Sequence, residues 1–282
     1  TPMMGQIQIT KKSADDNPFN ALAAGTLLPG ATFEIYNRAG DLVNTVVTDK
    51  NGVAKSDTLP LGRYTIRETK APMFYSAAAQ PIEAEIEFSG QIVRIEVLNQ
   101  SVYTNVSVNK RGYKQVTPSQ TIRYDFKDIA NNSTVPLNSF YWRDTLPTSA
   151  VRLTKIVTGT WNQRLSYKVV YKTNLHDYRT LADNLSTMKN YSLDASPAAL
   201  GLASNEYVTD FMFVFGTVKA GFAQVDAPYI FCWTNSWLNN SYQFTNRTDV
   251  GGMHSGQWIM ATDRWVTTVY KPGVTKLPKT GY

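Results

Sequence analysis

Three polar residues, Lys11, Glu68 and Asn99, each stand at the end of an apolar face in a segment that alternates between apolar and polar positions. Successive side chains of an extended strand point to opposite faces, so a polar residue in step with apolar ones is directed at the core. Burying any one of these groups alone would be costly, but together they can satisfy one another. The apolar residues in step with them are Ile7 and Ile9, Tyr64 and Ile66, and Val93, Ile95 and Val97.

A lysine, a carboxylic acid and an asparagine carboxamide buried together can form a covalent bond. Burial lowers the pKa of a lysine and raises that of a glutamate, which gives a neutral amine beside a protonated acid. The acid can polarise the carboxamide carbonyl while the amine attacks it, expelling ammonia and leaving an amide crosslink. The alternatives are three polar strand ends in solvent or a buried ion pair. Lys12 is a second candidate nucleophile, although the alternation places it on the polar face.

Short β-rich runs separated by turn signals must position these residues. The turn signals are clusters of Gly, Pro, Asn and Asp, which favour reversals of the chain. Spacing of this kind predicts a small β-sandwich over residues 1–100. The predicted strands lie at residues 5–12, 31–36, 42–48, 63–68, 82–88 and 92–98, and the turns at 29–30, 38–41, 49–52, 61–62 and 89–90.

Residues 5–11, 28–33, 64–72 and 97–99 carry a resemblance that extends along this whole domain. They resemble the CnaB-type, or SpaA prealbumin-like, module of Gram-positive pilins and adhesins, and the third segment is similar to the pilin E-box. The resemblance implies an intramolecular isopeptide bond between the first-strand lysine and the last-strand asparagine, with the glutamate as catalytic acid. The implied bond joins Lys11 to Asn99, and the implied acid is Glu68.

A second β-rich region, residues 101–271, opens as the first one does. Lys110 is in step with Val102, Val106 and Val108, so the alternation directs its amine at a core. The alternative is an exposed strand end. Further strand-like runs lie at residues 121–126, 135–144, 152–157, 167–171, 207–218, 229–234, 242–246 and 257–270.

Residues 178–202 are the least strand-like part of this region. Leu181, Leu185 and Met188 recur at helical spacing, and Pro197 stands near the end of the stretch. The pattern predicts a short helix or a loop insertion in an otherwise β-rich domain.

The passage at residues 124–147 is similar to repeat domains of bacterial surface proteins that share the CnaA-like sandwich. In that class an aspartate catalyses a bond between a first-strand lysine and a late-strand asparagine, so the resemblance implies a second crosslink, from Lys110. Two aspartates compete for the catalytic role. Asp144 shares its face with aromatic residues and Asp125 with polar ones, and a proton-holding acid needs the apolar side, which favours Asp144.

The acceptor in the second region is one of three asparagines. Asn246 shares a face with two aromatic residues, and the stretch after it resembles the continuation of the same family. It is therefore the first candidate, with Asn235 and Asn240 behind it.

The C-terminal residues Leu277, Pro278, Lys279, Thr280 and Gly281 match the LPxTG sorting signal of Gram-positive surface proteins. The proline fixes a bend and the glycine leaves room at the scissile bond. The resemblance implies that a sortase cleaves after the threonine and transfers its carboxyl to an amine. No secretion signal opens the sequence and no apolar span follows the motif, so the chain is expected to be a mature or trimmed part of a longer precursor.

Composition narrows the function further. The chain of 282 residues carries a formal charge of +6, but its 28 Lys and Arg are spread along it, so nucleic acid is not an expected partner. Many Tyr, Trp, Thr and Val favour an all-β protein. Neither histidine has neighbours at metal-ligand spacing, and no phosphate-binding loop occurs, so no metal, cofactor or enzymatic activity beyond self-crosslinking is expected. The single cysteine, Cys232, is expected to be a small buried hydrophobe.

These features predict two Ig-like β-sandwiches in tandem, a CnaB-type domain (1–100) and a CnaA-like domain (101–271), followed by a spacer and sorting signal (272–282). The expected protein is a pilin subunit, covalently anchored to the cell wall of a Gram-positive bacterium at the extracellular surface. Residues 265–272 carry Lys and Pro in the reverse order of the pilin motif, which favours a minor or wall-linking subunit over a backbone pilin. Its expected partners are a sortase and other pilin subunits or peptidoglycan. The alternative is a surface adhesin whose second domain binds a host matrix protein or glycan.

Overall fold

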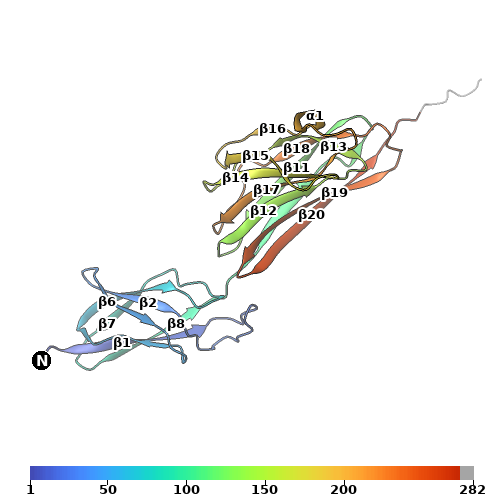
Figure 1. The fold of residues 1–282 in the computed structure, drawn as a ribbon. Helices are drawn as coiled ribbons and strands as arrows, with labels where there is room; N and C mark the ends of the chain where they lie inside the picture. Colours follow the sequence, from blue (N-terminus) through green and yellow to red (C-terminus); the bar gives the residue numbers. More distant parts are fainter. Residues whose placement is uncertain (274–282) are drawn as a thin grey trace, which may run out of the picture. The chain divides into compact units, whose positions relative to one another are not determined.

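The computed structural model describes residues 1–273, which divide into two compact units (Figure 1). The first unit runs from Thr1 to Tyr103, and the second begins at Thr104. Nearly all of the regular structure is β-strand, so the predicted all-β class is confirmed. In the described range no helix has both the length and the apolar character needed to cross a lipid bilayer.

The first unit is built from two four-stranded sheets. Its strands are β1 (Met4–Ser13), β2 (Thr32–Asn37), β3 (Leu42–Val47), β4 (Val53–Lys55), β5 (Leu59–Pro60), β6 (Gly62–Lys70), β7 (Ile82–Ile86) and β8 (Ile92–Asn99). One sheet has the order β4-β1-β5 with β8 also paired to β1, and the other has the order β3-β2-β6-β7. β1 and β8 run parallel, which is possible because the chain passes through the other strands between them.

The alternation along β1 decides what enters the core of the first unit. Ile7, Ile9 and Lys11 are in step and each is 0% exposed. Gly5 is in step with them and has room only for a hydrogen, because a Cβ there would lie 2.4 Å from the Cγ2 of Ile86. The lysine therefore lies on the inward face of β1, in step with apolar residues as the sequence pattern predicted, and Ser13 follows it on that face, also buried.

The second unit pairs a seven-stranded sheet with a five-stranded one. Its strands are β9 (Val106–Arg111), β10 (Gln115–Val116), β11 (Thr121–Asn131), β12 (Leu137–Thr145), β13 (Val151–Val157), β14 (Ser166–Thr173), β15 (Arg179–Ser186), β16 (Ser192–Asp194), β17 (Val208–Val218), β18 (Tyr229–Thr234), β19 (Gln243–His254) and β20 (Gln257–Val269). The larger sheet has the order β10-β20-β19-β12-β17-β14-β15, and the smaller has the order β16-β13-β18-β11-β9.

Aromatic side chains from both sheets fill the core of the second unit. Trp142 on β12 meets Phe126 on β11 with ring centroids 4.5 Å apart and Phe213 on β17 at 4.6 Å, both edge to face. Its indole N–H donates to the Thr248 hydroxyl at 2.8 Å, which satisfies the one polar atom of the ring. Cys232 is also fully buried in this core.

The stretch at residues 178–202 differs in part from its prediction. A short helix is present, but α1 covers only Pro197–Leu200. Leu181 and Leu185 lie instead in β15, which pairs with β14 across register shifts. A spacing of four residues returns a side chain to the same face in a strand as well as in a helix, so these leucines could not distinguish the two.

Candidate functional site

In the first unit, Lys11, Glu68 and Asn99 converge from β1, β6 and β8. The Nζ of Lys11 donates to Oε2 of Glu68 at 2.8 Å, and the Nδ2 of Asn99 donates to Oε1 of the same carboxyl at 2.6 Å. The lysine side chain is 0% exposed and the glutamate side chain 1%. The carboxyl therefore bridges the amine and the carboxamide inside the core, while Oδ1 of Asn99 has no hydrogen-bond partner.

Strand pairing explains why these groups meet. On the parallel strands β1 and β8, Lys11 is opposite Val97 and Ser13 is opposite Asn99. The lysine and the asparagine are thus two positions apart on neighbouring strands, with their side chains on the same face. Burial lowers the pKa of the Lys11 amine, and the hydrogen bond to Glu68 offsets part of that effect.

Lys12, the other candidate nucleophile, points away from this cluster. Its amine pairs with Glu96 at 3.0 Å, and both side chains are substantially exposed. Such a pair is solvated and contributes little to stability.

In the second unit, Lys110, Asp144 and Asn246 are brought together from β9, β12 and β19. The Nζ of Lys110 donates to Oδ1 of Asp144 at 2.9 Å, and both side chains are 0% exposed. Asn246 is also 0% exposed, and its amide lies near enough to Asp144 to lower the pKa of that carboxyl slightly against the larger effect of burial. No contact of normal hydrogen-bond geometry satisfies Oδ2 of Asp144 or either amide atom of Asn246.

Burial of this second cluster acts against its charged form, although two aromatic faces beside the amine attract an ammonium. The Nζ of Lys110 lies 4.2 Å from the ring centroid of Tyr124 and 4.1 Å from that of Phe126. Burial raises the pKa of the Asp144 carboxyl and lowers that of the Lys110 amine, although each group's attraction to the other acts in the opposite direction. Both shifts act in the direction of a neutral amine beside a protonated acid.

The other candidates for the acid and the acceptor of the second unit lie outside this cluster. Asp125 is partly exposed and pairs with Arg123 at 2.7 Å. Asn240 is exposed and its side-chain oxygen accepts from the backbone of Lys271. Asn235 is 3% exposed, but none of its described contacts reaches Lys110 or Asp144.

The sorting signal lies outside the described residues. Leu277, Pro278, Lys279, Thr280 and Gly281 all follow residue 273, where the description of the structure ends. Within residues 1–273 no group of three or more His, Cys, Asp or Glu side chains could hold a metal ion.

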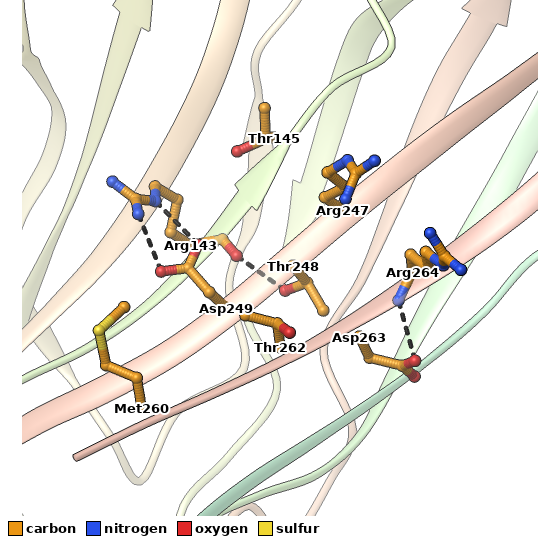
Figure 2. Close-up of a pocket in the computed structure, with 9 residues that line it drawn as sticks. All are labelled: Arg143, Thr145, Arg247, Thr248, Asp249, Met260, Thr262, Asp263 and Arg264. Carbon is orange, nitrogen blue, oxygen red and sulfur yellow. Dashed lines mark hydrogen bonds and ion pairs between the residues drawn. The ribbon is translucent and has the colours of Figure 1, made fainter.

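Two further polar groupings in the second unit left no signal in the sequence, because their members come from distant segments. A pocket of about 520 Å³ lies over β12, β19 and β20 (Figure 2). It is lined by Arg143, Thr145, Arg247, Thr248, Asp249, Met260, Thr262, Asp263 and Arg264.

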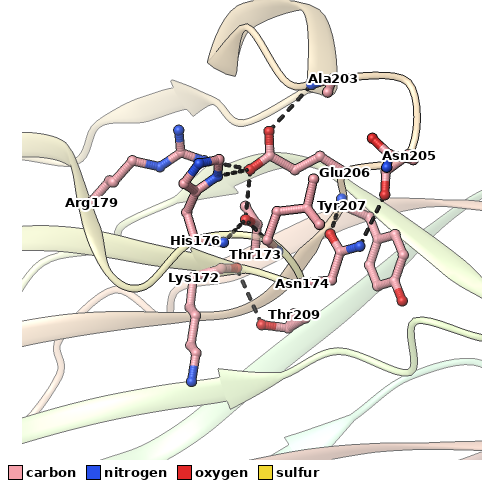
Figure 3. Close-up of polar contacts among 11 residues, drawn as sticks. Lys172, Thr173, Asn174, His176, Arg179, Ala203, Asn205, Glu206, Tyr207 and Thr209 are labelled. Atoms are coloured by element: carbon pink, nitrogen blue, oxygen red, sulfur yellow. Dashed lines mark hydrogen bonds and ion pairs between the residues drawn. The ribbon is translucent and has the colours of Figure 1, made fainter.

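The second grouping surrounds Glu206 (Figure 3). One oxygen of its carboxylate accepts from the Thr173 hydroxyl at 2.7 Å and from Arg179 at 2.8 Å, and it contacts the His176 ring at 2.8 Å. The other oxygen accepts from the backbone of Ala203 at 3.2 Å. These hydrogen bonds, led by the one from Thr173, lower the pKa of Glu206 to about 2. The carboxylate therefore ties the segment between α1 and β17 to the connection between β14 and β15.

Comparison with known proteins assigns a fold to the first unit. Residues 5–101 match the family model described as SpaA, prealbumin-like fold domain. The chain is 33% identical over 85 residues to the trypsin-resistant surface T6 protein of Streptococcus pyogenes serotype M6. That match covers 30% of this chain and 16% of the relative's length. The first unit therefore has the prealbumin-like fold of SpaA-type surface proteins.

Solved structures of pilins are also similar. The major pilin BcpA of Bacillus cereus aligns with a TM-score of 0.32 and 16% identity over 94% of this chain and 69% of that one. The full-length major pilin SpaD of Corynebacterium diphtheriae aligns with a TM-score of 0.30 and 18% identity over 94% and 67%. The minor pilin GBS52 of Streptococcus agalactiae aligns with a TM-score of 0.31 and 21% identity over 37% and 48%.

Proposed function

We propose that this chain belongs to a sortase-anchored surface protein, a pilin subunit of the minor or wall-linking kind, whose two units each close an internal Lys–Asn isopeptide bond. The observation that carries the proposal is the repetition of one buried constellation, an amine, a carboxyl and a carboxamide, in two units of different topology. Buried polar groups are normally retained only where they satisfy one another or perform a function.

In the first unit the reaction would begin when a proton passes from Lys11 to Glu68 along their 2.8 Å hydrogen bond, which leaves a neutral amine beside the acid. Rotating the side-chain amide of Asn99 by half a turn exchanges the positions of Nδ2 and the unpartnered Oδ1. Oδ1 then faces the carboxyl of Glu68 and accepts a hydrogen bond from its hydroxyl. The amine attacks Cγ of the polarised carboxamide, and the carbon–nitrogen bond to the original amide nitrogen breaks. One proton from the amine leaves with that nitrogen as ammonia, and the acid is restored, so an amine and a carboxamide become a secondary amide and ammonia.

The second unit would use the same steps with Lys110, Asp144 and Asn246. The unsatisfied amide atoms of Asn246 and the free Oδ2 of Asp144 support this assignment, because a resting polar cluster would be expected to pair them. Forming the bond removes the amide nitrogen as ammonia and engages the remaining carbonyl with the acid.

Each bond would tie together strands that are distant in sequence. Lys11 and Asn99 lie on the parallel first and last strands of the first unit, β1 and β8. Lys110 on β9 and Asn246 on β19 belong to different sheets of the second unit. A covalent bond at these positions would carry tension directly and suppress the local opening that admits proteases.

The prealbumin-like match of residues 5–101 supports a place on the cell surface, and the LPxTG sequence supports anchoring by a sortase through Thr280. The partners would be the sortase and either other pilin subunits or peptidoglycan, at the extracellular face of a Gram-positive cell wall.

The test is the intact mass of the purified chain compared with the mass calculated from its sequence. Two bonds predict a deficit of two ammonias, reduced to one in Lys11→Ala and in Lys110→Ala and to none in the double variant. Lys12→Ala is the matched control and should keep both bonds, because its amine faces solvent. A chain with the full calculated mass, or a deficit that survives both substitutions, would refute the crosslinks.

A further inference from the structure

Two arginines face each other on the seven-stranded sheet of the second unit. Arg247 on β19 and Arg264 on β20 are direct partners in the antiparallel ladder. Partners of this kind project from the same face with Cβ atoms roughly 4.5–5.5 Å apart, where like charges destabilise the sheet. Both side chains are exposed, and none of the ion pairs found in residues 1–273 involves either of them. The fold therefore holds two positive charges together without compensation.

The acids beside these arginines are already engaged. Asp249 accepts two hydrogen bonds from Arg143, each 2.9 Å long, and a third from the hydroxyl of Tyr141 at 2.7 Å. Asp263 accepts from the backbone N–H groups of Lys110 and Arg264. In Figure 2 no dashed line reaches the guanidinium of Arg247 or of Arg264. The pocket therefore keeps an excess of positive charge and free guanidinium donors.

The lining of the pocket adds hydroxyls and an apolar side. Thr145 and Thr262 are exposed beside the arginines. Met260 is in step with Arg264 along β20 and gives the lining its thioether, and the half-exposed Trp258 follows in the same row beyond the lining, where it packs against Tyr141. A volume of about 520 Å³ lies within the range of roughly 300–1,000 Å³ that is typical of small-ligand sites.

The floor of the pocket favours a saccharide over a peptide. It is formed by β12, β19 and β20, whose backbone groups pair with one another along the ladders. Extended peptides commonly bind by adding to a free sheet edge, whereas Arg247 and Arg264 project from the face of the sheet rather than along the edge of β20. Recognition on this face must come from side chains: guanidinium forks for an anionic group, threonine hydroxyls for other hydroxyls, and the thioether of Met260 for an apolar ring face.

We propose that this pocket is a binding site for an anionic saccharide, with a carboxylate or sulfate of the sugar held between Arg247 and Arg264. The bound anion relieves the repulsion between the two guanidinium groups, so binding and sheet stability act in the same direction. Asp144 and Asn246 lie on the opposite face of the same strands, next to Thr145 and Arg247 in sequence. The site nevertheless needs no crosslink and stands independently of it.

The test is a calorimetric titration of the full chain with 3′-sialyllactose as the carboxylate probe, a heparin-derived tetrasaccharide as the sulfate-rich probe, and neutral lactose. Saturable binding of at least one acidic probe is expected, and the two probes distinguish carboxylate from sulfate. Arg247→Gln/Arg264→Gln should weaken that binding by about tenfold or more, because it removes charge-assisted hydrogen bonds. Arg164→Gln removes an exposed arginine elsewhere in the same unit and should leave binding unchanged.

Melting curves check that the variants fold. The double variant should melt at or above the temperature of the parent, because a like-charge contact has been removed. The proposal is overturned if neither acidic probe binds, if lactose binds as well as 3′-sialyllactose and the tetrasaccharide, or if the double variant binds as the parent does. Tighter binding of a hexaglutamate peptide than of either sugar would likewise overturn it in favour of an acidic protein ligand.

Discussion

The Nζ of Lys110 lies 2.9 Å from Oδ1 of Asp144, and both side chains are 0% exposed. A buried ion pair is stable when further hydrogen bonds satisfy its remaining atoms. Here the second carboxyl oxygen has no partner, and neither amide atom of the neighbouring Asn246 has one. A permanent salt bridge would leave these three polar atoms without hydrogen bonds. In the proposed amide-forming step, each group would have a role.

The first prediction concerns the acids. Asp144→Asn and Glu68→Gln should each reduce the mass deficit by one ammonia, because one bond no longer forms. The amide side chain that replaces the acid cannot take up and transfer the proton that polarises the acceptor carbonyl. Intact mass after prolonged incubation is the measurement. Asp125→Asn is the matched control and should keep both bonds, since Asp125 pairs with Arg123 near the surface. A full deficit in Asp144→Asn would contradict the catalytic role.

The second prediction isolates the contribution of a covalent bond to stability. Asn246→Ala removes the acceptor, so the bond cannot form and Lys110 and Asp144 remain as the buried pair seen in the structure. In the chain-entropy model, closing a loop of roughly 100 residues stabilises a protein by about 4–5 kcal/mol, so the free energy of unfolding should fall by about that amount. Denaturant unfolding of the second unit is the measurement.

The same substitution in the first unit should have a comparable effect. In the crosslinked chain the amide nitrogen of Asn99 has left as ammonia, so the hydrogen bond that Asn99 donates to Glu68 belongs to the unreacted state. Asn99→Ala prevents the bond to Lys11, and the chain-entropy effect changes only slowly with loop length, so the free energy of unfolding of the first unit should also fall by about 4–5 kcal/mol. Denaturant unfolding is the measurement, and an unchanged first unit would contradict the bond.

The third prediction concerns Gly112. A Cβ at this position would lie 2.8 Å from the ring of Tyr124 and 3.0 Å from that of Trp265, so Gly112→Ala must displace the Tyr124 ring that packs on the amine of Lys110. The expected result is slower ammonia loss in the second unit and an unchanged rate in the first. Mass spectra recorded at intervals after refolding measure both rates. Equal rates in parent and variant would show that the ring does not position the amine.

The fourth prediction concerns acid stability. The pKa of Glu206 is lowered from 4.5 to about 2 in the folded chain, so the unfolded state takes up the proton first. The stabilising contribution is therefore fully present above about pH 4.5 and is lost as the pH falls toward 2. Glu206→Gln should be less stable than the parent at pH 7, and the gap should narrow steadily below pH 4.5.

Melting temperatures across this pH range, followed with a probe of the second unit, provide the measurement for Glu206. Glu87→Gln, an exposed position in the first unit, is the control and should follow the parent. A gap that stays constant from pH 7 to pH 2 would show that the carboxylate of Glu206 contributes no charge-dependent stability.

Strand alternation alone determined which side chains would face inward. A strand has a period of two, so being in step with apolar neighbours was enough to direct Lys11, Lys110, Asp144 and Asn246 at a core, and all four are buried. The all-β class likewise followed from local composition and turn spacing. Local pattern failed at Leu181 and Leu185, where a spacing of four fits a helix and a strand equally well.

Only the tertiary structure decided which of the inward side chains meet. The parallel pairing of β1 with β8 sets Lys11 beside Asn99, and the ladder of β19 with β20 sets Arg247 against Arg264. Glu206 likewise gathers partners from the ends of β14 and β15, which no periodicity connects to it. Pairings of this kind depend on which distant strands are adjacent and in what register, and that choice is made by the packing of the whole domain rather than by the local order of residues.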